Sequence, residues 1–233
     1  MNGILYIVPT PIGNLEDITL RALRVLKECD LIACEDTRQS LKLLSHFGIS
    51  KPLISFYSYN ERYRLGKILG KLSNGKKVAL ISDAGTPGIS DPGYVLVNGV
   101  IDKGIKLEVL PGASAMITAL VSSGLPINGF IFCGFLKRKL GKMKKELVEL
   151  INLKKTIVFY ESPYRILKTV GICSELFGEN VKVCLAREIT KKFEEFIRGT
   201  AKEVLENIKN RQNLFGEFVV LISPLSSQND QPE

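Results

Sequence analysis

The stretch Val78-Ala-Leu-Ile-Ser-Asp-Ala-Gly-Thr-Pro-Gly-Ile-Ser-Asp-Pro-Gly93 joins a short apolar run to a loop that holds three glycines and two prolines. The run Val78–Ile81 is typical of a buried strand, and the Ser90-Asp91-Pro92 step is typical of a helix start. Open α/β sheets bind their ligands at loops beyond the carboxyl ends of their strands. Glycines let the backbone approach a bound molecule, and prolines keep the loop rigid. A plain connecting loop has the same composition, so this stretch alone leaves both interpretations open.

In the part of the chain before Pro111-Gly112, five strands alternate with helices, which predicts a mostly parallel sheet covered by helices. The expected strands are Ile4–Val8, Leu31–Cys34, Leu53–Phe56, Val78–Ile81 and Leu107–Leu110, and the expected helices are Ile18–Glu28, Thr37–Phe47, Glu61–Leu72 and one after Asp91.

Beyond Pro111-Gly112 the strands lie closer together, which predicts a mixed sheet with antiparallel pairs. The expected strands are Phe130–Phe135, Thr156–Tyr160, Val181–Ala186, Glu194–Arg198 and Glu217–Ile222, and the helices are Ser114–Ser123, Lys139–Ile151, Tyr164–Phe177 and Ala201–Lys209. The prediction is an α/β protein of two α/β domains, residues 1–111 and 112–224. The polar tail, residues 225–233, is expected to be disordered.

Composition narrows the class of protein. The chain has 233 residues, of which 45% are hydrophobic and 24% charged, and this is typical of a globular protein with a core. A net charge of +8 favours an anionic partner, nucleic acid first. Five cysteines without C-x-x-C spacing are expected to be reduced and buried, as in a cytoplasmic protein. A single histidine, His46, argues against a Cys/His zinc site, and no apolar stretch is long enough to span a membrane.

Three further segments are predicted to lie at the same sheet edge as the loop after Val78–Ile81. They are Pro9–Leu15, Glu35–Arg38 and Pro111–Ala115. Each has a plain alternative, namely a rigid turn, a helix cap and a domain hinge respectively. No G-x-G-x-x-G follows the first strand, so the fingerprint of a dinucleotide site is missing.

In the second half, Glu161–Arg165 and Ala186–Lys191 each place an arginine and a glutamate at the end of an expected strand. Structural salt bridges are the alternative explanation for both. A dense basic run, Phe135–Lys145, is either a solvated helix face or a surface that contacts phosphate.

Taken together, the motifs resemble a known family. They are Pro9–Ile18, Cys34–Arg38, Ser82–Gly93, Leu110–Ser114, Glu161–Arg165, Ala186–Glu188 and Gly216–Phe218. In this order and spacing they resemble the small-subunit ribosomal RNA branch of the tetrapyrrole methylases, the class III S-adenosylmethionine-dependent methyltransferases. The resemblance covers roughly residues 4 to 222.

The resemblance implies S-adenosylmethionine bound between the two domains, and methylation of the ribose 2′-OH of a decoding-site cytidine, nucleotide 1402 of 16S rRNA. It also implies the 30S subunit as substrate and a homodimer. The cofactor-binding residues that it implies are Pro9, Ala84, Gly85, Thr86, Pro87, Gly88, Ile89, Ala113, Ser114, Leu136 and Ala186.

A ribose hydroxyl must lose its proton during the transfer, so a nearby carboxylate is expected to help. The candidate carboxylates are Glu35, Asp36, Glu161 and Glu188, and Asp36 is favoured together with Arg38. The expected RNA contacts are Arg38, Lys137, Arg138, Lys139, Arg165 and Arg187, and no metal is expected. Two alternatives stay open, a tetrapyrrole C-methyltransferase on the same scaffold and a non-catalytic RNA-binding factor.

Overall fold

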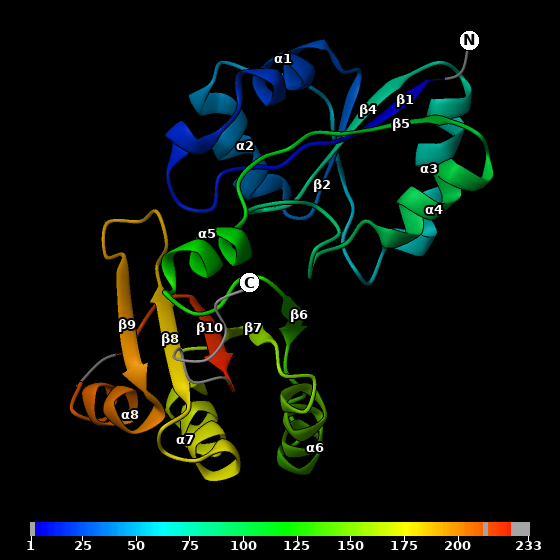
Figure 1. Ribbon diagram of the computed structural model, residues 1–233. Coiled ribbons are helices and arrows are strands. Elements are labelled where there is room, and N and C mark those ends of the chain that lie inside the picture. Colours follow the sequence, from blue (N-terminus) through cyan, green and yellow to red (C-terminus); the bar gives the residue numbers. More distant parts are fainter. Residues whose placement is uncertain (1–2, 212–213, 225–233) are drawn as a thin grey trace. The chain divides into compact units, whose positions relative to one another are not determined.

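The computed structural model describes residues 3–211 and 214–224 and divides the chain into two compact units, Met1–Ser114 and Ala115–Glu233 (Figure 1). The division lies close to the domain boundary expected at residue 111. The predicted polar tail, residues 225–233, lies outside the described residues.

Unit 1 is built on a five-stranded sheet in which every pair of neighbouring strands is parallel, in the order β3-β2-β4-β1-β5. Its strands are β1 (Ile4–Ile7), β2 (Leu31–Cys34), β3 (Leu53–Ser55), β4 (Lys77–Ile81) and β5 (Lys106–Val109). Its helices are the short 3-10 turn η1 (Leu15–Asp17), α1 (Leu20–Glu28), α2 (Thr37–His46), α3 (Glu61–Ser73) and α4 (Tyr94–Asp102). The predicted parallel sheet is confirmed.

Strand alternation gives unit 1 a separate apolar core on each face of its sheet. In β4, Val78 and Leu80 pack in one core with side chains of α3 and α4, whereas Ala79 and Ile81 pack in the other with α1 and α2. Figure 1 shows the two helix pairs on opposite sides of this sheet. Each fully buried leucine or isoleucine contributes roughly 1.5–3 kcal/mol, so both faces stabilise the position of the strand ends.

Two helices of unit 1 begin later than the sequence predicts. The Thr19 side chain accepts a hydrogen bond from the Ala22 amide, so α1 begins at Leu20 rather than near Ile18. The helix start predicted at Asp91-Pro92 is wrong, because α4 begins at Tyr94. Its N-cap, Gly93, has a φ of +150°, which is outside the helical range, so Pro92 precedes the helix.

Unit 2 contains a mixed five-stranded sheet of order β6-β7-β10-β8-β9, in which only β6 and β7 pair in parallel. Its strands are β6 (Phe130–Phe135), β7 (Thr156–Glu161), β8 (Lys182–Arg187), β9 (Glu195–Thr200) and β10 (Phe218–Ser223). Its helices are α5 (Ala115–Ser122), α6 (Leu140–Ile151), α7 (Ile166–Phe177) and α8 (Ala201–Lys209). The predicted mixed sheet is confirmed.

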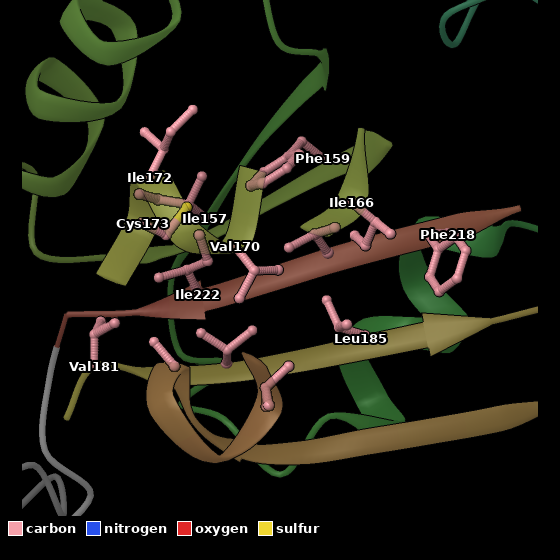
Figure 2. Packing of buried hydrophobic residues seen from close by; sticks show 14 of the residues in the cluster. Ile157, Phe159, Ile166, Val170, Ile172, Cys173, Val181, Leu185, Phe218 and Ile222 are labelled. Atoms are coloured by element: carbon pink, nitrogen blue, oxygen red, sulfur yellow. The ribbon is translucent and has the colours of Figure 1, made fainter. Parts of the chain in front are cut away.

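One large core holds α6, α7 and α8 against a single face of this sheet (Figure 2). Ile166 and Val170 of α7 pack there with Phe159 of β7 and Leu185 of β8. On the opposite face, α5 packs against β7 and β10. The core therefore fixes the ends of β7 and β8, where the second half of the chain carries its predicted site residues.

All five cysteines are free thiols. Cys29, Cys34, Cys173 and Cys184 are buried, and Cys133 is half-buried. Burial raises the pKa of each thiol, to about 12 for Cys173 and to about 11 for Cys133 and Cys184. Thiols with such pKa values are unreactive at neutral pH, because the thiolate is the nucleophile.

Candidate functional site

The predicted first-domain loops meet at one edge of the parallel sheet. Ile7 of β1 pairs with Leu80 of β4 and with Val109 of β5, and Cys34 of β2 pairs with Ile81. Because the strands are parallel and in register, the segments that follow them leave the sheet at the same edge. The site is therefore assembled from four loops that are far apart in the sequence.

The loop after β1 is tied to the glycine-rich loop after β4 by its main chain. The Thr10 amide donates to the Gly85 carbonyl over 2.9 Å, and the Gly85 amide donates back to Thr10 over 3.0 Å. The Thr10 hydroxyl also donates to the Ser82 carbonyl over 3.1 Å and is buried. Gly85 has a φ of +78°, a conformation that costs an L-residue roughly 1–2 kcal/mol, so glycine suits this position.

The loop after β5 packs closely against the other two. A Cβ on Gly112 would lie 2.5 Å from the Cβ of Pro9, which is much closer than carbon atoms normally approach. The Thr86 hydroxyl donates to the Ala113 carbonyl over 3.4 Å. The three loops that were predicted to bind the cofactor therefore form one interlocked framework within unit 1.

The predicted cofactor residues of this framework differ in exposure. Pro9, Gly85 and Pro87 are buried, Thr86, Ala113 and Ser114 are half-buried, and Ala84, Gly88 and Ile89 are exposed. Gly88 has a φ of +86°, and a Cβ at this position would meet nothing within 4 Å, so its main chain is open to approach. The buried members hold the exposed ones in place.

Asp36 and Arg38 form a bidentate pair at the start of α2. Arg38 donates to Asp36 through Nε over 3.1 Å and through Nη2 over 2.6 Å, and the Arg38 amide donates to Asp36 Oδ1 over 2.8 Å. The Arg38 side chain and then its amide hold the pKa of Asp36 down at about 2. A carboxylate with so low a pKa is a weak base. Arg38 itself keeps 85% of its side chain exposed.

Two aspartates of the glycine-rich loop have raised pKa values, in contrast to the lowered pKa of Asp36. Asp83 Oδ1 accepts a hydrogen bond from the Asp36 amide over 3.1 Å, and burial raises its pKa. Burial, and then the charge of Asp83, raise the pKa of Asp91 to about 6. Burial likewise raises the pKa of Glu35. Asp83 and Asp91 are not among the site residues predicted from the sequence, and their position after a buried strand was the available signal.

In unit 2, Glu161 is built into a buried network. Its Oε2 accepts from the Thr169 hydroxyl over 2.7 Å, and its Oε1 accepts from the Ser162 amide over 2.7 Å. Arg165 Nε lies 3.4 Å from Oε1, and only 1% of the Glu161 side chain is exposed. Both carboxylate oxygens are thus engaged within the fold, and Arg165 reaches on to the Lys137 carbonyl over 3.3 Å.

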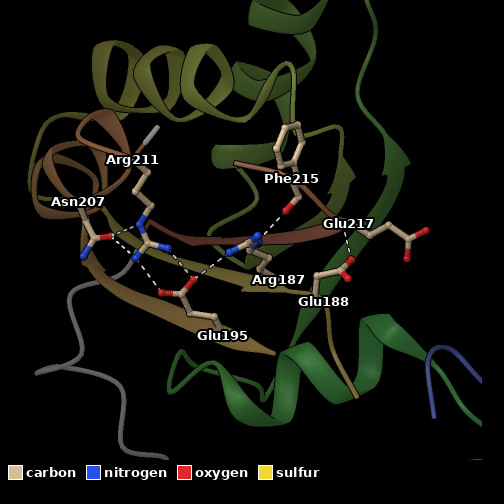
Figure 3. Close-up of polar contacts among 7 residues, drawn as sticks. All are labelled: Arg187, Glu188, Glu195, Asn207, Arg211, Phe215 and Glu217. Atoms are coloured by element: carbon tan, nitrogen blue, oxygen red, sulfur yellow. Dashed lines mark hydrogen bonds and ion pairs between the residues drawn. The ribbon is translucent and has the colours of Figure 1, made fainter. Parts of the chain in front are cut away.

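Arg187 and Glu188, at the end of β8, are also engaged by neighbours (Figure 3). Arg187 donates through Nε to the Phe215 carbonyl over 2.7 Å and pairs with Glu195 over 3.5 Å. Glu188 Oε1 accepts from Lys191 over 3.0 Å and from the Glu217 amide over 2.9 Å. Burial opposes the ionisation of Glu188, but these hydrogen bonds outweigh it and leave its pKa lowered.

The remaining predicted residues of unit 2 fall into two groups. Leu136 and Ala186 are buried, with 2% and 0% of their surface exposed. Lys137, Arg138 and Lys139 are exposed and lie between β6 and α6. The Lys137 amide donates to Glu146 over 3.1 Å, which holds the start of this basic segment against α6.

Within residues 3–211 and 214–224, no group of three or more histidine, cysteine, aspartate or glutamate side chains is arranged to hold a metal ion. Over the same residues, no helix is both long enough and apolar enough to cross a membrane.

Comparison with known proteins identifies the family. The family model "Tetrapyrrole (Corrin/Porphyrin) Methylases" matches residues 4–205. The chain is 49% identical over 221 residues to Ribosomal RNA small subunit methyltransferase I of Hydrogenobaculum sp. (strain Y04AAS1), covering 94% of this chain and 95% of that relative. The chain belongs to the ribosomal RNA small subunit methyltransferase I family.

A second family member, from Thermotoga maritima, is 48% identical over 224 residues, covering 95% of this chain and 98% of the relative. The member from Bacillus subtilis is 46% identical, and this chain covers 77% of its length, so family members differ in length. Both comparisons confirm the resemblance that the motifs predicted. They also confirm that the chain is a methyltransferase.

Solved structures confirm the fold. A diphthine synthase has a TM-score of 0.71 at 15% identity, covering 95% of this chain and 90% of that chain. Uroporphyrin-III C-methyl transferase from Thermus thermophilus, complexed with S-adenyl homocysteine, has a TM-score of 0.63 at 20% identity, covering 94% of this chain and 97% of that chain. The chain therefore shares its fold with proteins named as a diphthine synthase and a uroporphyrin-III C-methyl transferase.

Proposed function

We propose that this chain transfers a methyl group from S-adenosylmethionine to the ribose 2′-OH of a decoding-site cytidine, nucleotide 1402, in 16S rRNA of the 30S subunit. The family membership supports this proposal most strongly, since relatives named as small-subunit rRNA methyltransferases align over nearly the whole chain. The net charge of +8 suits an RNA substrate. The acting form is proposed to be a homodimer, which sedimentation of the purified protein tests.

The interlocked loops suit the proposed cofactor. S-adenosylmethionine supplies an activated methyl group on its sulfonium. Exposed main chain at Ala84 and Gly88 is placed to bind polar groups, and half-buried Ala113 offers a small side chain beside it. In unit 2, we propose Leu136 and Ala186, which are both buried, as further cofactor-binding positions. The remaining proposed cofactor contacts are Pro9, Gly85, Thr86, Pro87, Ile89 and Ser114.

The protein's main contribution is to align the hydroxyl with the methyl group, which can be worth several kcal/mol. We assign Arg38 to an RNA phosphate, because its guanidinium is exposed and fixed by Asp36. The pKa of about 2 makes Asp36 a positioning partner of Arg38 rather than the proton acceptor. Asp91, with its pKa raised to about 6, suits proton transfer better, since an acceptor works best with a pKa near the working pH.

In unit 2, we propose that Glu161 and Glu188 act by positioning. Glu161 holds Arg165, and Glu188, which follows Arg187, binds Lys191 and the Glu217 amide. The RNA contacts proposed for this unit are Lys137, Arg138, Lys139, Arg165 and Arg187. Of these, the first three have exposed side chains, whereas Arg165 and Arg187 are partly covered.

The deciding experiment is transfer of a tritiated methyl group to 30S subunits that lack their own methylation, followed by mapping of the labelled nucleotide. Label on the ribose of the decoding-site cytidine is expected. Label on a base, or none on RNA, contradicts the proposal. A parallel reaction with uroporphyrinogen III as acceptor tests the tetrapyrrole alternative, and calorimetry with S-adenosylmethionine tests the non-catalytic one.

A matched pair of arginine variants tests the role of Arg38. Arg38→Gln is expected to lower transfer to 30S subunits while leaving the affinity for S-adenosylmethionine unchanged. Arg24→Gln is the control, because Arg24 is another exposed arginine of unit 1 that pairs with an acid, Glu28, within its helix. Equal activity of the two variants would contradict the assignment.

A further inference from the structure

Three exposed tyrosines lie in and beside the segment that joins β3 to α3. Tyr57 is 40% exposed, Tyr59 is 97% exposed and Tyr63 is 83% exposed. Exposing large rings to water forgoes the stabilisation that their burial would give. Neither the core of unit 1 nor the interlocked loops use these three rings.

The segment is held in one conformation. The Asn60 side chain donates to Ser55 Oγ over 3.0 Å and accepts from the Tyr57 amide over 2.9 Å, so it clamps both ends of the loop. Phe56 anchors the loop in the core with only 1% of its surface exposed. The rings are therefore presented on a fixed support, which lowers the entropic cost of binding a partner.

Positive charge accompanies the rings. Arg62 is exposed, and the guanidinium of Arg64 lies 5.6 Å from the centroid of the Tyr63 ring, within the range of a cation–π contact. Among the described residues, the buried Nε of Arg64 has no hydrogen-bond partner. The whole of α3 carries four basic residues against one acidic residue, Glu61.

This surface shares its sheet edge with the proposed catalytic loops. Ser55 at the end of β3 pairs with Cys34 at the end of β2, and the Phe56 amide donates to the Cys34 carbonyl over 2.8 Å. The segment with Asp36 and Arg38 follows Cys34 directly. Since neighbouring strands are about 4.8 Å apart, the end of β3 lies roughly 10 Å from the end of β4 and its glycine-rich loop. Nucleotides next to a target base can span such a distance.

We propose that Tyr57, Tyr59, Tyr63, Arg62 and Arg64 form a stacking surface for unpaired RNA nucleotides that flank the methylated one. Bases stack on the exposed rings of Tyr59 and Tyr63, and the arginines neutralise the neighbouring phosphates. The proposal rests on the RNA substrate proposed above. The charge excess of α3 favours a polyanion over a protein partner, although tyrosine and arginine also occur in protein interfaces.

The test compares Tyr59→Ala and Tyr63→Ala with Tyr59→Phe and Tyr63→Phe, which keep the ring and remove only the hydroxyl. The probe is a labelled single-stranded RNA that carries the target cytidine, used alone and annealed to its complement. Fluorescence anisotropy is expected to show about tenfold weaker binding of the single strand for each alanine variant and little change for each phenylalanine variant. The KM for 30S subunits should rise in parallel, while the affinity for S-adenosylmethionine stays the same.

Several outcomes would overturn the proposal. Alanine variants that bind the single strand as tightly as the parent protein contradict stacking, even if the parent methylates 30S subunits normally. A change in sedimentation with unchanged RNA affinity would show instead that the rings contact a second copy of the chain. If the parent protein fails to methylate 30S subunits, the proposed function fails, and the anisotropy series still decides whether the tyrosines bind RNA.

Discussion

The contact between Gly112 and Pro9 makes a single methyl group a sensitive probe of the loop framework. In Gly112→Ala, the new Cβ would lie 2.5 Å from the Cβ and 2.9 Å from the Cγ of Pro9. Carbon atoms prefer separations of about 3.5–4.0 Å, so the loops after β1 and β5 must move apart by roughly 1 Å. Overpacking of this kind costs about 1–3 kcal/mol.

The strain is expected to spread beyond the two residues. Pro9 precedes Thr10, whose main chain pairs with Gly85, and Gly112 precedes Ala113, which accepts from the Thr86 hydroxyl. Separation of the loops therefore stretches contacts on both sides of the glycine-rich loop. If about 2 kcal/mol of the cost falls on cofactor binding, the affinity for S-adenosylmethionine drops roughly 30-fold.

Urea denaturation measures the loss of stability in Gly112→Ala, and calorimetry with S-adenosylmethionine measures the loss of cofactor affinity. Gly70→Ala is the control, because Gly70 lies exposed in α3 with nothing within 4 Å of its Cβ position. The same chemical change in that helix is expected to stabilise unit 1 by up to about 1 kcal/mol. A Gly112→Ala protein with the parent's stability and cofactor affinity would refute the packing argument.

Three further changes give separate tests. The pKa of Asp91 is raised to about 6 from an ordinary 3.8, so the folded state loses stability as pH rises through this window. In thermal unfolding at pH 8, Asp91→Asn should be more stable than the parent by about 1 kcal/mol, after allowance for partial exposure. At pH 4 this difference should largely vanish. Arg38→Gln should raise the pKa of Asp36 from about 2 toward its ordinary range, as measured by NMR titration, and an unchanged pKa would contradict the pairing. Thr169→Val removes a 2.7 Å hydrogen bond to buried Glu161 and should destabilise unit 2 by about 1.5–3 kcal/mol; an unchanged unfolding midpoint would show that this bond contributes nothing.

Much of the fold follows from local sequence signals. Apolar runs such as Val78–Ile81 identify the buried strands, and the spacing between strands separates the parallel sheet from the mixed one. Because parallel strands end at one edge, the sequence predicts that Pro9, Gly85 and Ala113 lie at the same edge, whereas the strand order that makes them neighbours comes from the structure. The start of α4 was not predictable in this way, because the backbone conformation of Gly93 overrides the capping signal at Asp91-Pro92.

The electrostatics of the candidate site could not be read from the sequence. Asp36 and Arg38 are two residues apart, and only their side-chain geometry shows that one neutralises the other. The partner of Glu161, Thr169, lies on the following helix, and Arg187 finds Glu195 on the neighbouring strand. Such contacts depend on packing across the sheet, which the order of residues along the chain does not specify.

The reactivity of the buried thiols can be used to follow the unfolding of each unit. Cys29 and Cys34 lie in unit 1, whereas Cys133, Cys173 and Cys184 lie in unit 2. Because Cys29, Cys34, Cys173 and Cys184 are buried and have raised pKa values, an alkylating reagent reaches each of them chiefly when its own unit opens. Mass spectrometry after a brief pulse of reagent thus measures the opening of the two units separately, without any substitution in the chain.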